Sequence, residues 1–97
     1  MAYNWAFGHF NAGNNLMQKK QYRAAIVKYT MGIELFPNDQ LVFVYLAGAF
    51  AMAGEFSISL ELANCVDIGK AKPETKVEIA ERLQRTRHFI SSQTSHT

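Results

Sequence analysis

Residues 10–39 read FNAGNNLMQKKQYRAAIVKYTMGIELFPND, and this stretch decides the fold. Apolar side chains recur at steps of three and four over residues 22–36, which is the spacing of one face of an α-helix. Pro37 then disfavours helix in the residue before it, and the Asn-Asp pair that follows can cap another helix. With a first helix over about residues 4–19 and a polar turn after it, the stretch predicts a helical hairpin.

The chain also repeats itself at a spacing of 34 residues. Tyr22 and Phe56 have this spacing, as do Ala25 and Ser59, so that residues of similar size occupy the same step of the repeat. Three further pairs follow the same rule: Leu16 with Phe50, Ala12 with Leu46, and Ile26 with Leu60. Such a period over a helical hairpin is typical of stacked helix–turn–helix units, which build binding surfaces rather than catalytic centres.

The second copy of the hairpin is predicted from similar signals. A third helix over about residues 40–53 ends before Gly54, and a fourth over about residues 56–69 ends at Gly69, because glycine readily adopts the left-handed backbone that ends a helix.

A fifth, amphipathic helix follows, opened by Pro73, whose missing N–H is tolerated in a first turn. Terminal repeats need such a cover because their outer apolar face would otherwise meet water. The sequence therefore predicts an all-α fold in one domain over residues 1–90. Its expected parts are repeat one at about 6–39, repeat two at about 40–73, the capping helix at about 73–90, and a flexible tail at 91–97.

These residues resemble a tetratricopeptide repeat. The matches include a small Gly13 in the first helix, Tyr22 opening the second, Ala25 where the helices touch, and Pro37 at the end. A weaker copy runs over residues 40–73. The resemblance implies an antiparallel helix-hairpin superhelix that acts as a protein–protein interaction module and binds a peptide on its concave face.

The two copies depart from the family pattern at packing positions. The second copy has Ala47 in place of the first-helix glycine and Ser59 in place of the packing alanine. The first copy has Lys20 where the turn between helices usually has glycine. Both replacements in the second copy are small, so the helices are still expected to approach closely.

In this family the first helix of each hairpin lines the concave groove, and the residues expected there are unusually apolar. The expected peptide contacts are Phe7, Phe10, Asn11, Asn14, Met17, Leu41, Val44, Tyr45 and Met52. Residues 41–54 carry no charge at all. Such a surface fits the hydrophobic side chains of a peptide or amphipathic helix. We therefore expect an adaptor or assembly subunit that binds a partner protein.

One alternative is a self-associating structural protein, in which a second copy covers the apolar groove. Large exposed apolar patches are rare on free monomers. Two repeats also form a shorter stack than the three that such folds usually need, so a homodimer would supply the missing burial.

A second alternative follows from the resemblance. Some tetratricopeptide co-chaperones hold the acidic C-terminal tail of heat-shock chaperones with a clamp of lysines, an arginine and asparagines, because a terminal carboxylate needs charged and amide donors. Asn14 matches one clamp asparagine. Phe10 and Tyr45 replace a clamp lysine and the second asparagine, and the basic positions of a third repeat fall at Thr75 and Ile79.

No nucleic-acid site is expected, because a net charge of +2 is small. The arginines of the fifth helix, Arg82, Arg85 and Arg87, adjoin Glu78 and Glu81, which favours a solvated cap face.

Enzyme, metal and cofactor roles have no supporting pattern. His9, His88 and His96 are scattered without metal-ligand spacing. Cys65 is the single cysteine; we expect a buried, inert thiol in a reducing compartment, the cytoplasm with the nucleus as an alternative. The charge-free stretch of 14 residues is shorter than the roughly 20 that span a bilayer, so no membrane insertion is expected.

Overall fold

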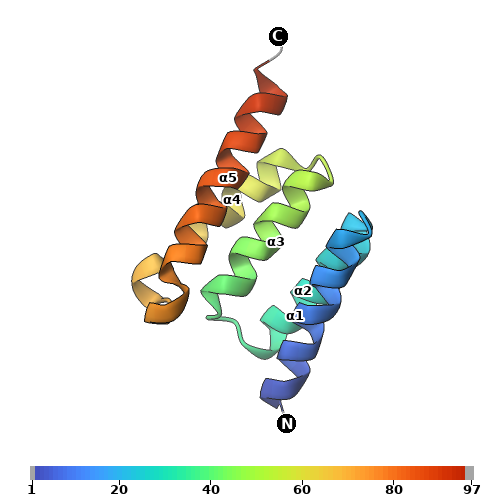
Figure 1. Ribbon diagram of the computed structural model, residues 1–97, viewed down its shortest axis with the longest axis vertical. Helices are drawn as coiled ribbons and strands as arrows, with labels where there is room; N and C mark the ends of the chain where they lie inside the picture. The colour runs from blue at the N-terminus through green and yellow to red at the C-terminus, as the bar shows by residue number, and fades with distance from the viewer. Residues whose placement is uncertain (1, 96–97) are drawn as a thin grey trace.

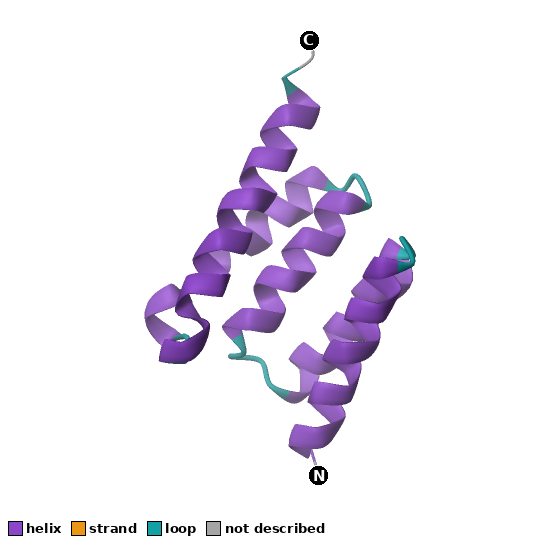
Figure 2. Cartoon of the chain, viewed as in Figure 1, coloured by secondary structure: helices purple, strands orange, loops and turns teal. Residues whose placement is uncertain are grey.

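Antiparallel helix pairs build the molecule in the computed structural model, which describes the backbone of residues 2–95 and the side chains of residues 7–95. Over these residues no strand occurs, and the all-α helical hairpin fold is confirmed (Figures 1 and 2). The elements are α1 (Ala2–Gln18), α2 (Tyr22–Leu35), α3 (Gln40–Met52), α4 (Phe56–Cys65) and α5 (Lys76–Thr94), with the short 3₁₀ turns η1 (Ile68–Lys70) and η2 (Pro73–Thr75) between α4 and α5.

The turns of the two hairpins share one backbone pattern. The N–H of Gln21 donates to the carbonyl five residues earlier at 2.9 Å, and the N–H of Glu55 does the same at 2.9 Å. This bond closes the end of a helix when the preceding residue is left-handed. Lys20 has a φ of 62° and Gly54 a φ of 85°. The repeat seen in the sequence is therefore repeated in the backbone.

Helix α3 is the central element, placed between the α1–α2 hairpin and α5 (Figure 1). Its charge-free sequence is explained by burial on several sides, since it packs against α2, α4 and α5. The core joins α2 to α3 and contains Ala25, Tyr29, Val42, Leu46 and Ala49. Burial of a helix on several sides favours apolar residues all round rather than a single stripe.

The fourth helix ends at Cys65, before the predicted end at Gly69. The Asp67 side chain accepts a hydrogen bond from the Gly69 N–H at 3.0 Å, while its own N–H donates to the buried Gln40 side chain at 2.8 Å. A short polar side chain that offers the backbone such alternative bonds competes with helix. The prediction of helix over residues 66–69 was therefore wrong.

The fifth helix is shifted toward the C-terminus relative to the prediction. Pro73 opens η2 rather than the long helix, and α5 runs from Lys76 to Thr94 instead of over residues 73–90. Neither proline nor glycine interrupts the sequence after Lys76, so the helix continues into the segment expected to be a tail. Residues 96–97 of that segment lie outside the described residues.

Candidate binding groove

A groove of about 460 Å³ lies between α1, α3 and α5. It lies on the side of the stack that is formed by the first helix of each hairpin, α1 and α3. Its apolar lining comes mainly from α3, and its polar groups come from α1 and α5. The lining residues are Asn14, Met17, Gln18, Tyr29, Val44, Tyr45, Gly48, Ala51, Met52, Arg82, Arg85, Thr86 and Phe89. The groove has the mixture of apolar floor and few polar groups that is typical of ligand sites.

The wall from α1 is fixed by one hydrogen bond. The Tyr29 hydroxyl donates to Oδ1 of Asn14 at 2.5 Å. Because this bond uses the amide oxygen of Asn14, the NH₂ group is the donor that the side chain can offer to a ligand. Burial, followed by the nearby Tyr45, raises the pKa of Tyr29, so its hydroxyl stays protonated and keeps donating.

The floor is centred on Tyr45 of α3. Its ring meets Phe10 edge-on, with 4.7 Å between the ring centroids, and lies 6.0 Å from the ring of Tyr29. Its hydroxyl donates a hydrogen bond to Glu78 of α5. Burial, followed by this hydrogen bond, raises the pKa of Tyr45 to about 12. Tyr45 therefore joins α1, α3 and α5 at the groove.

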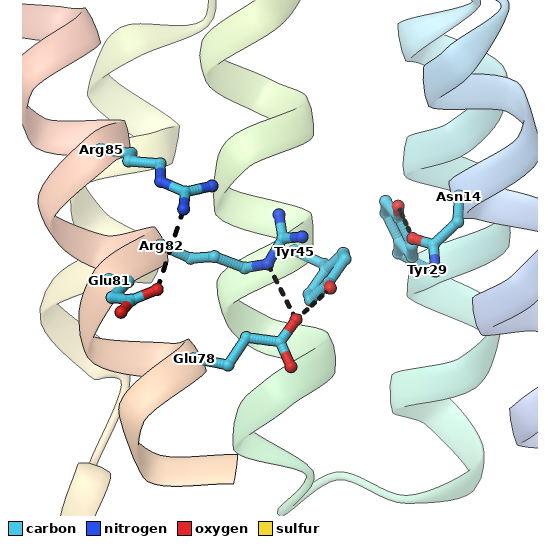
Figure 3. A network of polar contacts seen from close by, with 7 residues as sticks. All are labelled: Asn14, Tyr29, Tyr45, Glu78, Glu81, Arg82 and Arg85. Carbon is cyan, nitrogen blue, oxygen red and sulfur yellow. Dashed lines mark hydrogen bonds and ion pairs between the residues drawn. The ribbon is translucent and has the colours of Figure 1, made fainter.

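The wall from α5 carries two arginines, Arg82 and Arg85, whose side chains extend toward α3 (Figure 3). The guanidinium carbon of Arg82 lies 3.8 Å from the Tyr45 ring centroid, and its Nε donates to Glu78 at 3.1 Å. The hydrogen bond from Tyr45, followed by the one from Arg82, lowers the pKa of Glu78. Arg82 is therefore held by its own chain as well as facing the groove.

Arg85 is the less constrained of the two. Among the side chains that the structure describes, it forms an ion pair only with Glu81, at 3.8 Å, and its own side chain is 73% exposed. An exposed pair between residues four apart on a helix contributes little, about 0.3–0.5 kcal/mol, so a ligand carboxylate can replace Glu81 at small cost. Asn14 from one wall and Arg85 from the other can thus present hydrogen-bond donors to the same ligand.

The structure divides the expected contact residues between two sites. Five of them line the groove together: Asn14, Met17, Val44, Tyr45 and Met52. Three others, Phe7, Phe10 and Leu41, line a second cavity of about 570 Å³ beside the α2–α3 loop and the 3₁₀ turns. Asn11 lies exposed on α1 and lines neither. Val44 is only 1% exposed, so it supports the floor from below rather than offering a surface.

The sequence missed the two groove arginines. They were assigned to a solvated cap face, while the repeat spacing placed the third-repeat basic positions at Thr75 and Ile79. In the structure, Arg82 and Arg85 line the groove and Ile79 is fully buried. The 34-residue step itself leads to both arginines. Asn14, Gly48 and Arg82 are spaced by 34 residues, as are Met17, Ala51 and Arg85, and all six line the groove. The assignment to a solvated cap face, made from the neighbouring Glu78 and Glu81, therefore missed the place of these arginines in the groove.

Other chemistry-bearing groups do not form a site in the part of the chain that the structure describes. Over residues 2–95 no group of three His, Cys, Asp or Glu side chains could hold a metal ion. Cys65 is exposed at the end of α4, which corrects the expectation of a buried thiol. None of the described helices has both the length and the apolar character that crossing a membrane requires.

Two curated proteins are similar to this chain, both called Hsp70-Hsp90 organising protein, one from Plasmodium falciparum and one from its isolate 3D7. Each is 36% identical over 63 residues, which is 64% of this chain. The chain spans 25% of the length of the first and 11% of the second. No protein-family model matches the chain, and no solved structure matches it. The similarity is consistent with a tetratricopeptide-type fold and suggests a role in protein interaction.

Proposed function

We propose that this chain is a non-catalytic interaction module that binds a peptide or helix of a partner protein in the groove between α1, α3 and α5. The observation that carries the proposal is the arrangement of the groove: an apolar floor on α3 lies between an amide on α1 and two guanidinium groups on α5. Every one of these groups belongs to a helix, which gives the ligand a preformed surface.

The arrangement selects a type of ligand. Met17 and Met52 offer flexible apolar surface that adapts to varied side chains. Arg85 and the NH₂ group of Asn14 offer donors for carboxylate or carbonyl oxygens. The preferred ligand is therefore a segment in which apolar side chains neighbour an acidic group.

A second candidate is binding of the acidic C-terminal tail of a heat-shock chaperone. Two observations favour this candidate. Arg82 and Arg85 bring positive charge to the groove opposite Asn14, and the similar proteins bear the name Hsp70-Hsp90 organising protein. Against it, Tyr45 still occupies the position of a clamp asparagine, and Arg82 is already paired with Glu78.

The test is fluorescence anisotropy with three labelled peptides of equal length. One is acidic with a free C-terminal carboxylate, one is the same peptide with an amidated C-terminus, and one is an amphipathic apolar helix former. An ionic contact should weaken steeply between about 50 and about 500 mM salt, whereas apolar binding should change little. Preference for the free carboxylate together with steep salt dependence would select the chaperone-tail candidate.

Two variants locate the binding site. Met52→Glu places a charge on the groove floor and should weaken binding of the preferred peptide about tenfold or more. Arg85→Gln should weaken only the acidic peptides. Met31→Glu is the matched control, because Met31 is a methionine of similar exposure on α2, outside the groove (40% against 42% for Met52). If Met52→Glu and Arg85→Gln both bound as wild type while the fold held, the groove would not be the binding site.

A further inference from the structure

The two groove arginines are paired with their own helix in different ways. Glu78 precedes Arg82 by four residues, and the two form an ion pair at 3.1 Å. Glu81 precedes Arg85 by the same spacing, but this pair is longer, at 3.8 Å, and both of its side chains are more exposed. A ligand carboxylate that approaches the groove therefore meets two unequal competitors.

Glu78 is held by more than its ion pair with Arg82. Its Oε2 accepts a hydrogen bond from Nε of Arg82 and another from the hydroxyl of Tyr45. The guanidinium of Arg82 also lies against the Tyr45 ring, so that the three side chains form one connected cluster (Figure 3). The hydrogen bond from Tyr45 lowers the pKa of Glu78, which keeps its carboxylate charged at neutral pH.

This cluster occupies donors that a ligand acid would otherwise use. The Tyr45 hydroxyl and the Arg82 Nε–H both belong to residues that line the groove, and both already donate to one carboxylate. Glu78 itself does not line the groove. A second carboxylate at Arg82 would have to use the terminal nitrogens of the guanidinium, close to a like charge that disfavours it. Glu78 is therefore an internal counter-ion of Arg82.

Arg85 lies in a different situation. Its ion pair with Glu81 is exposed, and exposed pairs at this spacing contribute little, so a ligand acid can replace Glu81 at small cost. Arg85 follows Arg82 by three residues, which is about 4.5 Å along the helix axis. The groove thus presents one cation that a ligand can reach and, next to it, one whose charge is already balanced.

We propose that Glu78 determines the charge selectivity of the groove: it neutralises Arg82 and leaves Arg85 to receive one acidic group of the ligand. Such a groove favours an apolar segment with a single acidic residue and gains nothing from a run of acidic residues. A repulsive group at a site is one means by which a protein rejects a competing ligand. Because Glu78 acts through Arg82, it is a positioning residue. The inference rests on the proposed function, since it describes the ligand of that groove.

The test is fluorescence anisotropy with three labelled peptides that share one apolar sequence and an amidated C-terminus. The neutral peptide has glutamine at three consecutive positions, the mono-acidic peptide has glutamate at one of them, and the tri-acidic peptide has glutamate at all three. Wild type should bind the mono-acidic peptide about three- to tenfold more tightly than the neutral one. It should bind the tri-acidic peptide within about twofold of the mono-acidic one.

Glu78→Gln is the decisive variant, because glutamine keeps an oxygen that can accept the same hydrogen bonds but has no charge. It should bind the tri-acidic peptide about three- to tenfold more tightly than wild type does and leave the other two peptides within about twofold. Loosening of the fold would instead weaken all three peptides. Glu81→Gln is the matched control: it also removes a carboxylate beside a groove arginine, and it should leave the ratio of tri-acidic to mono-acidic affinity unchanged.

A variant of the arginine gives an independent measurement of the same ratio. Arg82→Gln leaves the charge of Glu78 without its partner, so the tri-acidic peptide should bind about threefold or more weakly than the mono-acidic one. Adding Glu78→Gln to Arg82→Gln removes the remaining charge and should return the ratio to about one. Circular dichroism checks that each variant is folded.

The outcomes separate this inference from the proposed function. Wild type that binds the tri-acidic peptide about tenfold or more tightly than the mono-acidic one would overturn the inference and leave the groove as the binding site. An affinity ratio that stays the same in Glu78→Gln and in Arg82→Gln would do so too. If wild type bound none of the three peptides at concentrations up to about 1 mM, the proposed function would fail, and the inference with it.

Discussion

The two hairpins have the same backbone but fill their helix–helix contacts in different ways. In the α1–α2 hairpin, Gly13 lies directly against the ring of Tyr29, which is 1% exposed. One repeat later the same two positions are Ala47 and Ala63, both buried. The first hairpin thus fills this contact with a glycine and a tyrosine, and the second hairpin fills it with two alanines.

The second hairpin makes up for its smaller side chains with a polar contact. Ser59 stands at the position of Ala25, and its hydroxyl donates to the backbone carbonyl of Ala47 at 2.6 Å. Both Ser59 and Ala25 are completely buried. The two helices of each hairpin therefore approach each other closely in both repeats. The side chains that allow this approach differ between the repeats, and a larger residue on one helix is matched by a smaller one on the other.

The largest expected effect comes from giving the first hairpin the small residue of the second. In Gly13→Ala, the new Cβ would lie 2.5 Å from Cε1 of Tyr29, so this buried ring would have to shift. The free energy of unfolding should fall by about 2–3 kcal/mol, measured by urea denaturation. Gly8→Ala in the same helix is the control, since a Cβ there meets nothing within 4 Å.

The same contact can be tested for coupling. In a Tyr29→Ala background, which reproduces the pair of the second hairpin, Gly13→Ala should cost much less than it does alone. Equal costs in the two backgrounds would show that the overlap with the ring is not the cause. A similar loss in Gly8→Ala would point to a general effect on α1.

A smaller effect is expected from removing the polar contact of the second hairpin. Ser59→Ala should lower the free energy of unfolding by about 1 kcal/mol, because it deletes one buried hydrogen bond without opening a large cavity. Ala25→Ser in the first hairpin is the counterpart and should be nearly neutral, provided the hydroxyl reaches the carbonyl of Gly13. Thermal unfolding of both variants tests this; a stabilised Ser59→Ala would contradict the role of the hydroxyl.

The repeat could be predicted because it depends on residues close in sequence. The helix spacing over residues 22–36 and the 34-residue period led to the hairpins and to the buried pair of Ala25 and Ser59. These features reflect the 3.6-residue turn of the helix and the need for small residues where helices touch, and both can be read from one stretch of sequence.

The end of α4 could not be predicted in the same way. It depends on Asp67, whose backbone N–H donates to the side chain of Gln40, a residue far away in sequence. The place of Arg82 was missed for another reason: two steps of 34 residues from Asn14 lead to Arg82 in the groove, but the neighbouring Glu78 favoured a solvated face. Ile79 is one such step from Tyr45 and is nevertheless fully buried, so equal spacing does not fix the burial of a residue in the last helix of the stack.

A substitution in the turn of the first hairpin is expected to raise the stability of the protein rather than lower it. Lys20 adopts a φ of 62°, a left-handed conformation that Gly54 supplies in the second turn without steric cost. Lys20→Gly should therefore raise the free energy of unfolding by about 0.5–1 kcal/mol, because a Cβ is strained in this region of backbone space. Differential scanning calorimetry against Lys19→Gly, the neighbouring control, measures the gain. Destabilisation by Lys20→Gly would mean that the lysine side chain contributes more than its backbone strain costs.

The smallest expected change in stability concerns the hydrogen bonds made by the hydroxyls of the two groove tyrosines. Tyr29 bonds to the neutral Asn14, whereas Tyr45 bonds to the carboxylate of Glu78. The folded-state pKa of Glu78 is lowered, so its contribution is fully present above the ordinary value of 4.5 and is lost as the pH falls through the folded-state value. Glu78→Gln should remove this loss and flatten the decline of the melting temperature below about pH 4.5.

Because Glu78 is partly exposed, the change should be less than about 0.5 kcal/mol, and it requires a matched control. Glu81→Gln also removes a carboxylate from α5, but one paired only with the exposed Arg85. Its acid profile should stay close to that of wild type. An equal flattening in Glu81→Gln would assign the acid sensitivity to the net charge of α5 and not to the bond with Tyr45. A flattened profile in Glu78→Gln alone would instead identify the Tyr45–Glu78 hydrogen bond as the acid-sensitive link between α3 and α5. The bond between Tyr29 and Asn14 cannot act in this way, because the Asn14 amide does not titrate.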